Sequence, residues 1–188
     1  MAEAFSNKVA RAAGIVTSYS GSTVAAGSTA ITVTALTGIG VSFLVDNQHF
    51  IAGTKVVSTS PVSGGVGTVF TDRNSTNTSS ASSQTVRFLG PTTAYTSAAS
   101  TKSVIIGGTF ANNTSNSVNL TVEVYDTSVG VTSTGSVAIA SKIPVPAGSS
   151  FVISDTGKTL LEGLDEVRVY CDTANGVDVS LSILTGVN

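Results

Sequence analysis

The sequence predicts a mainly β protein, with a short N-terminal helix, a small β-module and then an antiparallel β-sandwich of immunoglobulin-like or jelly-roll-like type. Serine and threonine make up 55 of the 188 residues and valine a further 26, whereas charged residues are only 11%. β-Branched side chains are restricted in helices and pack well on a pleated sheet. Short runs of such residues also recur between turn-forming clusters, which is typical of antiparallel β-folds.

Residues 2–13 are the one segment with the composition of a helix, and they lie within an N-terminal arm of residues 1–14. Five of them are alanine, and Phe5, Val9 and Ala12 share one helical face at the spacing i, i+4, i+7. A helix this short is not stable in isolation, so it must dock on its own body or on another subunit. We expect Phe5, Val9 and Ala12 to anchor the chain to a neighbouring subunit.

Residues 15–91 are predicted to form a small β-module, because short apolar runs alternate there with turn signals. In Ala30–Leu36, apolar and polar side chains alternate, which places one face of a strand in a core and the other in water. Residues 74–83 form a low-complexity polar loop. The other strands expected in this module cover residues 41–45, 54–58, 68–70 and 85–89.

A Gly-Pro step at residues 90–91, followed by small polar residues, predicts a linker over residues 92–102. Charge changes sign nearby: residues 1–93 carry five basic and three acidic side chains, whereas residues 94–188 carry four basic and eight acidic ones. Residues 103–188 are then predicted as a β-sandwich domain, because strands and turn clusters alternate at short intervals. The strands expected there cover residues 103–111, 118–126, 136–143, 149–154, 166–172 and 177–184.

Composition and charge exclude several classes of function. One histidine and one cysteine cannot form a two-histidine metal site or a disulfide within one chain. No run of about 18 apolar residues marks a membrane span, and a formal net charge of −2 gives no electrostatic case for binding nucleic acid. The first residues lack the pattern of a secretory signal, so we expect synthesis in the cytoplasm without export by that route.

No catalytic, cofactor-binding or metal-binding residue is predicted. His49 lies beside a predicted turn with no serine elbow to serve, and Cys171 lies inside an apolar strand, where a thiol behaves as a small hydrophobe. The acidic residues Glu162, Asp165 and Glu166 match neither a calcium loop nor a glycosidase pair beside aromatic platforms. We interpret them as a solvated surface and expect a protein that is not an enzyme.

The first of two notable stretches runs from Gly40 to Val56 through a short apolar strand and the sequence Ala-Gly-Thr-Lys-Val, and a closing strand ends at Phe88. This looks like a recurrent phage β-module, and the chain resembles structural proteins of tailed-bacteriophage virions, especially those of marine hosts. The family often has Gly-Met or Gly-Asp before the strand and Ile-Pro before Ala-Gly-Thr, where this chain has Ser42-Phe43 and Phe50-Ile51.

The second half is similar to small β-sandwich modules of phage head, neck and tail proteins. The matching stretches begin at Val118 (Val-Asn-Leu-Thr-Val-Glu-Val), Ile143 (Ile-Pro-Val-Pro-Ala-Gly-Ser) and Leu164 (Leu-Asp-Glu-Val-Arg-Val). The resemblance implies a capsid-decorating or neck-associated virion protein, present in many copies and assembled in the host cytoplasm. Its partners would be capsid, portal, neck or tail proteins and further copies of itself, with no cofactor, nucleic acid or membrane.

A tail-fibre or receptor-binding module that binds carbohydrate is the main alternative, and a carbohydrate-active enzyme or lectin is a third class. Such proteins use exposed aromatic side chains to stack on sugars. Aromatic residues are only 6% of this sequence, and the tyrosines of its second half are Tyr95, Tyr125 and Tyr170. The sequence therefore favours the structural role.

Overall fold

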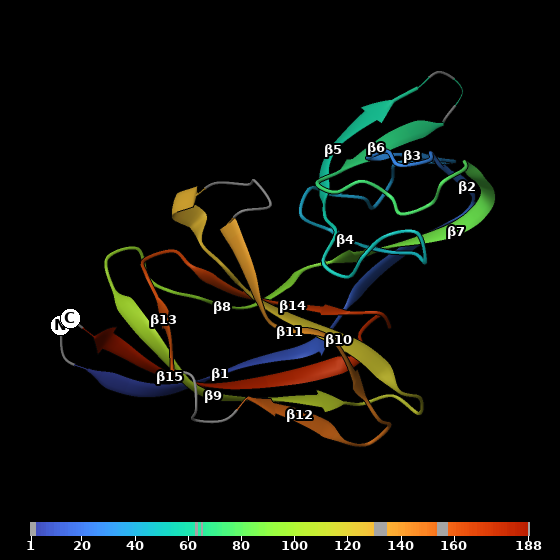
Figure 1. Ribbon diagram of the computed structural model, residues 1–188. Coiled ribbons are helices and arrows are strands. Elements are labelled where there is room, and N and C mark those ends of the chain that lie inside the picture. The colour runs from blue at the N-terminus through green and yellow to red at the C-terminus, as the bar shows by residue number, and fades with distance from the viewer. Residues whose placement is uncertain (1–2, 63, 65, 130–134, 154–157, 188) are drawn as a thin grey trace. The chain divides into compact units, whose positions relative to one another are not determined.

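The described strands form antiparallel β-sheets, as the computed structural model in Figure 1 shows, so the predicted mainly β class is confirmed. The structure describes residues 3–62, 64, 66–129, 135–153 and 158–187. It divides the chain into two compact units. We call residues 16–91 the inserted unit, and the described residues that precede and follow them in the sequence the flanking unit.

The predicted N-terminal helix is wrong, because residues Ala4–Ala13 form strand β1. This strand pairs antiparallel with β15 (Val177–Val187), regularly from Ala4 opposite Thr185 to Ala10 opposite Val179. A helix would satisfy its own backbone but would bury only a narrow stripe of side chains. Pairing with β15 at the other end of the chain instead satisfies one edge of β1 and buries Ala10 and Ala13 against the core, and this tertiary gain outweighs the helix propensity of the alanines.

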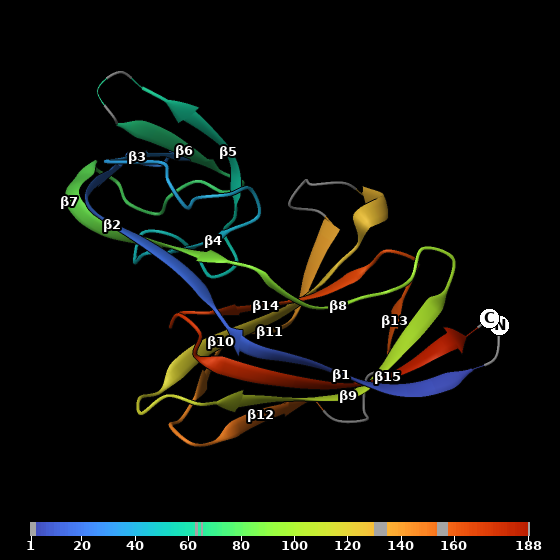
Figure 2. The same cartoon turned by 180° about the vertical axis from the view of Figure 1, so that it is seen from behind.

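The flanking unit contains two antiparallel sheets. The first, the five-stranded sheet, has the order β1-β15-β9-β12, with β13 pairing β9 beyond the end of β12. The second, the four-stranded sheet, has the order β11-β10-β14-β8. Both views show β1 beside β15 (Figures 1 and 2). The remaining strands are β8 (Thr92–Thr96), β9 (Lys102–Asn112), β10 (Val118–Tyr125), β11 (Ser136–Val145), β12 (Ser150–Ile153), β13 (Thr159–Leu161) and β14 (Glu166–Cys171), and a short 3-10 helix, η2, covers Thr127–Val129.

The two sheets of the flanking unit share one hydrophobic core. Phe110 and Leu181 enter it from the five-stranded sheet, and Leu120 and Val169 enter it from the four-stranded sheet. Because side chains alternate between the faces of a strand, each sheet turns one row of apolar residues inward and a second row away from this core. We call the second side the outer face of each sheet.

The predicted linker over residues 92–102 is not a linker along its whole length. Thr92–Thr96 form β8, which pairs with β14 at the edge of the four-stranded sheet, and β9 begins at Lys102. Tyr95 is buried in the shared core, where its hydroxyl lies 2.8 Å from the Ser103 hydroxyl. One buried aromatic residue thus fixes a segment whose small polar residues resemble a loop.

The inserted unit is a six-stranded antiparallel sheet with the order β4-β7-β2-β3-β6-β5. The two ends of this order are joined by backbone hydrogen bonds, from Val45 N–H to the Thr54 carbonyl (2.8 Å) and from Val56 N–H to the Phe43 carbonyl (2.9 Å). The sheet therefore closes on itself, which leaves fewer free edges. Its strands are β2 (Ile15–Val24), β3 (Ala30–Val33), β4 (Leu44–Asp46), β5 (Val56–Pro61), β6 (Gly67–Thr71) and β7 (Ala81–Gly90).

The interior of the inserted unit is a separate apolar cluster. It is built from buried residues of all six strands and of the turn before Ile51, namely Val24, Ile31, Val33, Val45, Phe50, Val56, Val69, Val86 and Phe88. The predicted alternation in Ala30–Leu36 explains two of these, because Ile31 and Val33 point inward while Thr32 is exposed. Gly67 is required here, because a Cβ at this position would collide with the side chain of Leu36.

Candidate docking face

Phe5 and Val9, two of the three predicted anchoring residues, lie together on the outer face of the five-stranded sheet. Their side chains are 80% and 73% exposed. Positions 4, 6, 8 and 10 of β1 turn to the other side, and Ala10 packs against the shared core. Large apolar side chains left this exposed on the edge strand of a sheet mark the face as a candidate for contact with another protein.

Phe5 begins an apolar row that crosses four strands. Phe5 lies opposite Leu184, Leu184 lies opposite Val104, and Val104 lies opposite Leu160. Directly opposite side chains in antiparallel strands are neighbours on the same face. Leu160 is also exposed, whereas Leu184 and Val104 are partly covered. The row therefore presents a continuous apolar band on the outer face.

A second row starts from Val9 and is more polar. Val9 lies opposite Ser180, Ser180 opposite Thr109, and Thr109 opposite the exposed Val152. Beside this row lies a shallow hollow of about 340 Å³, which Val9, Thr109 and Asp178 help to line. The outer face thus combines an apolar band with a hollow whose polar lining consists of hydroxyl groups, the Asp178 carboxylate and Arg11.

Ala12, the third predicted anchoring residue, is not on this row. It lies in an irregularity of β1 between Ala10 and Ala13, has φ 56°, and donates its backbone N–H to the Asp178 carboxylate at 2.8 Å. The adjacent Gly14 has φ 126°, and a Cβ there would collide with the Thr173 carbonyl oxygen. Ala12 therefore helps to turn the strand and does not extend the apolar band.

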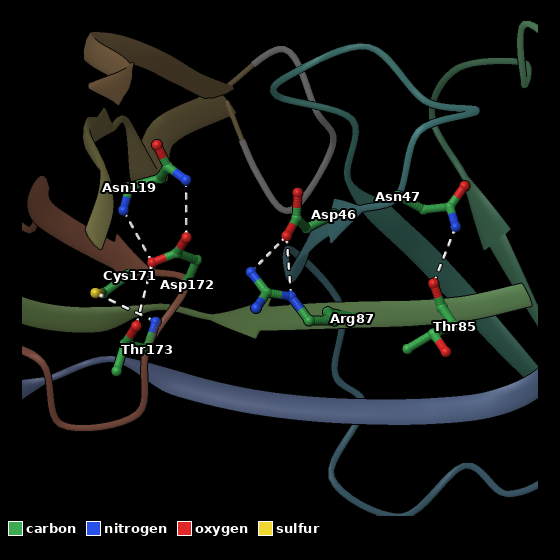
Figure 3. Close-up of polar contacts among 8 residues, drawn as sticks. All are labelled: Asp46, Asn47, Thr85, Arg87, Asn119, Cys171, Asp172 and Thr173. Atoms are coloured by element: carbon green, nitrogen blue, oxygen red, sulfur yellow. Dashed lines mark hydrogen bonds and ion pairs between the residues drawn. The ribbon is translucent and has the colours of Figure 1, made fainter. Parts of the chain in front are cut away.

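The single histidine and cysteine have structural surroundings. His49 belongs to a turn in which its backbone N–H donates to the Asn47 side-chain oxygen at 2.9 Å, and the Asn47 amide donates to the Thr85 carbonyl at 3.0 Å (Figure 3). Cys171 is completely buried in the shared core, and its sulfur accepts the Thr173 N–H at 3.4 Å (Figure 3).

Two acidic residues, Asp165 and Asp172, hold loops in place through their carboxylates. Asp165 is buried, and its two carboxylate oxygens accept the backbone N–H groups of Thr127 and Glu162. Its interpretation as a solvated residue is therefore wrong. Asp172 accepts the backbone N–H of Asn119 at 2.9 Å and its side-chain amide at 2.8 Å (Figure 3). Among the described residues, no group of three or more histidine, cysteine, aspartate or glutamate side chains is arranged to hold a metal ion.

An ion pair in the inserted unit has a similar structural role. Arg87 on β7 donates from Nε (3.0 Å) and Nη2 (2.6 Å) to one oxygen of Asp46 on β4 (Figure 3). These two residues are directly opposite each other in the pairing of the two strands. The pair is partly exposed, so it fixes the register of β4 against β7 more than it adds stability.

The outer face of the four-stranded sheet carries a polar cluster that the sequence analysis missed. The Arg168 guanidinium lies 3.6 Å from the centre of the Tyr125 ring, and its Nε donates to Glu166 at 2.7 Å. Tyr170 is completely buried, and Glu123 is 3% exposed. Burial raises the pKa of Tyr170, and the neighbouring Glu123 carboxylate raises it further. Tyr125, Tyr170 and Glu123 are buried and Arg168 and Glu166 are partly exposed, so the cluster acts mainly as packing.

The sequence signal for this cluster was an alternation of residues that share a face, because residues two apart on a strand point to the same side. It reads Glu166-x-Arg168-x-Tyr170 on β14 and Glu123-x-Tyr125 on β10.

Among the described residues, no helix is both long and apolar enough to cross a lipid bilayer. No protein-family model matches the chain, and the comparisons with curated proteins and with solved structures give no match.

Proposed function

We propose that this chain is a non-enzymatic structural component of a tailed-phage virion, present in many copies as a capsid-decorating or neck-associated protein. The observation that carries the proposal is the exposed apolar band on the outer face of the five-stranded sheet, which begins at Phe5 and ends at Leu160. Such a band is a liability on a free protein and is useful on one held permanently against partners. The partners would be other virion proteins and copies of this chain.

The strand order of the flanking unit supports this proposal. Strands β12 and β13 both pair with β9, and counting them as one interrupted strand gives the unit eight strand positions. Following the chain, these eight positions alternate between the two sheets except at β10 and β11, which are neighbours in the four-stranded sheet. We propose that it is a jelly roll, an architecture found in viral capsid and lectin domains. Fold alone does not assign function, so this is supporting evidence only.

The chemistry of the described side chains also favours a structural role. A hydrolase of the Ser-His-Asp type needs a histidine within hydrogen-bond reach of a nucleophile. His49 instead lies in a turn beside Gln48, with 3.4 Å between its Nε2 and the Gln48 Nε2. Asp165 and Asp172 already accept backbone N–H groups, so both carboxylates stabilise the fold.

The test compares two valines of similar exposure on different sheets. Val9 is 73% exposed on β1, and Val137 is 69% exposed on β11. Val9→Asp places a charge on the proposed docking face, whereas Val137→Asp places the same charge elsewhere. Particles assembled with each variant would be separated into heads and tails, and the chain would be quantified in each fraction by mass spectrometry.

We expect the Val137→Asp protein to enter particles at the wild-type copy number and the Val9→Asp protein to be depleted at least tenfold. Equal incorporation of both variants would reject the outer face as the anchor. Absence of the wild-type chain from purified particles would reject the virion role itself. Circular dichroism of both variants distinguishes loss of docking from loss of folding.

A receptor-binding module is the second candidate, because lectins also use the jelly roll. The burial of the tyrosines weighs against it: Tyr95, Tyr125 and Tyr170 are all buried, so none offers a platform for a sugar ring. Binding to an array of host surface glycans would test this alternative. Saturable binding of one glycan by the isolated chain would favour it over the decorating role.

A further inference from the structure

Strand β1 is the one long and regular edge among the described strands of the flanking unit. It has ten residues without proline, and its register with β15 is regular from Ala4 to Ala10. The opposite edge of the same sheet is divided between β12, with four residues, and β13, with three. The four-stranded sheet ends on one side at β8, which has five residues and a register shift.

The other edge strand of the four-stranded sheet, β11, is longer than β8, but its pairing is irregular. Its register against β10 shifts twice, Lys142 has φ 51°, and Pro144 removes a backbone donor. Bulges, proline and short strands are the devices by which proteins prevent the edges of their sheets from pairing with other chains. Three edges of the flanking unit carry a bulge, a proline or a short strand, whereas β1 has none of these along Ala4–Ala10, and the charged side chain of Lys8 is its one protective feature there.

We propose that β1 pairs with β1 of a second copy of this chain, antiparallel and about a twofold axis, so that two five-stranded sheets become one continuous sheet. This inference does not depend on the proposed virion role. The twofold axis stands perpendicular to the sheet and passes between the two copies of one residue, which keeps both outer faces on the same side. Only an axis at Asn7 overlaps the whole regular segment Ala4–Ala10 with its copy.

The side chains of β1 are complementary in this register. Phe5 lies opposite Val9 of the second copy, and Ala4 lies opposite Ala10, while the two Asn7 side chains face each other. An aromatic residue opposite a β-branched residue is a favourable cross-strand pair. Each of the two exposed apolar residues of β1 thereby gains an apolar neighbour on the same face.

The charges on β1 fit the same register. Lys8 lies opposite Ser6 of the second copy, so the two lysines do not face each other. Just outside the regular segment, Glu3 lies opposite Arg11, and the twofold axis makes this ion pair twice. Glu3 and Arg11 are both exposed at the two ends of the strand. An axis moved to Lys8 would place the two lysines directly opposite each other, which is unfavourable.

Disulfide trapping tests the register directly. Across the twofold axis, the two Cα atoms of residue 7 would lie about 4.5–5.5 Å apart, within the range of about 4.4–6.8 Å that a disulfide spans. The Asn7→Cys variant would be oxidised with oxidised glutathione, which takes up the two electrons and two protons of the thiols. Cys171 does not interfere, because it is completely buried.

Ser182→Cys is the matched control. Ser182 is exposed on the same face and lies directly opposite Asn7 on β15. In the proposed dimer its two copies are separated by three strand spacings, about 14 Å, which no disulfide spans. We expect a covalent dimer from Asn7→Cys and a monomer from Ser182→Cys on non-reducing gels. Equal cross-linking of both variants would show that copies stack face to face and would overturn the proposal.

A charge exchange tests the same pairing without covalent chemistry. Glu3→Arg and Arg11→Glu each place like charges opposite each other in a homodimer. Mixing the two variant chains restores both ion pairs in a heterodimer. We expect each variant alone to dimerise about tenfold more weakly than the wild type in sedimentation equilibrium, and the equimolar mixture to recover wild-type affinity. No recovery of affinity on mixing would overturn the proposal. So would a wild-type chain that stays monomeric when its concentration is raised about 100-fold above the lowest concentration that sedimentation can measure.

Discussion

The two sheets of the flanking unit differ most in their outer faces. The four-stranded sheet carries titratable and aromatic side chains there, yet Glu123, Tyr125 and Tyr170 are buried and contact one another or Arg168. The five-stranded sheet carries apolar side chains, yet Phe5 and Val9 are exposed. Polarity therefore does not identify the surface in contact with water. The apolar face is the one left open to a partner.

The largest expected effect contrasts one aromatic residue from each face. Tyr170→Ala removes a completely buried ring, and we expect a loss of about 3–5 kcal/mol in the free energy of unfolding. Phe5→Ala removes a ring that is 80% exposed, and we expect a change within about 0.5 kcal/mol for the monomer. Denaturant unfolding of both variants measures the difference. Similar losses would show that Phe5 packs within its own chain.

The next effect concerns the ion pair of the buried cluster. Arg168→Leu removes the contact with the Tyr125 ring and the hydrogen bond to Glu166, and we expect a loss of about 2 kcal/mol. Lys102→Met is the control, because Lys102 and Glu162 are mainly exposed and their charged groups are 3.8 Å apart. We expect almost no effect from this change in the same unfolding assay. If the free energy of unfolding of Arg168→Leu equals that of the wild type, the polar contacts of the cluster contribute little to stability beyond packing.

Much of the fold could be predicted from the sequence, because the alternation of apolar and hydroxyl residues gives strands a clear period. Strands β9, β10 and β15 lie close to their predicted positions. Strand β8 was missed, because Tyr95 is the only bulky residue in a run of small polar ones. Strand β1 was missed for a different reason: its alanines have high helix propensity, and its pairing partner lies at the other end of the chain.

The predicted N-terminal helix is wrong, yet two of the three residues predicted to share its apolar face also share a face of strand β1. Phe5 and Val9 are four residues apart, a spacing that places two side chains on the same face of a helix and also of a strand. Ala12 is three residues from Val9, which shares a face in a helix but not in a strand. The structure accordingly keeps Phe5 and Val9 together and separates Ala12. The buried cluster was missed because alternating charged residues resemble a solvated surface.

A smaller effect appears at high pH. The pKa of Tyr170 is raised in the folded state, so above about pH 10, where an unfolded tyrosine ionises, the native chain binds more protons than the unfolded chain. The free energy of unfolding should then fall as pH rises above about 10, by up to about 1.4 kcal/mol per pH unit from this residue. Tyr170→Phe should lack this component while paralleling the wild type below pH 9. Parallel curves from pH 9 to 11 would show that Tyr170 ionises normally.

The smallest effect on monomer stability tests the open face most specifically. Val9→Thr keeps the shape and β-propensity of the side chain, and Val137→Thr does the same at a similarly exposed position of β11. In dilute solution we expect the free energy of unfolding of both variants to lie within about 0.5 kcal/mol of the wild-type value.

If two copies pair through β1, association stabilises the folded chain by mass action, so the wild-type melting temperature should rise with protein concentration. Val137→Thr should show the same rise and Val9→Thr a smaller one, because Val9 is the residue opposite Phe5 of the second copy. A melting temperature that does not depend on concentration in all three proteins would show that copies do not pair through β1. The exposed apolar band would then be expected to contact a different protein.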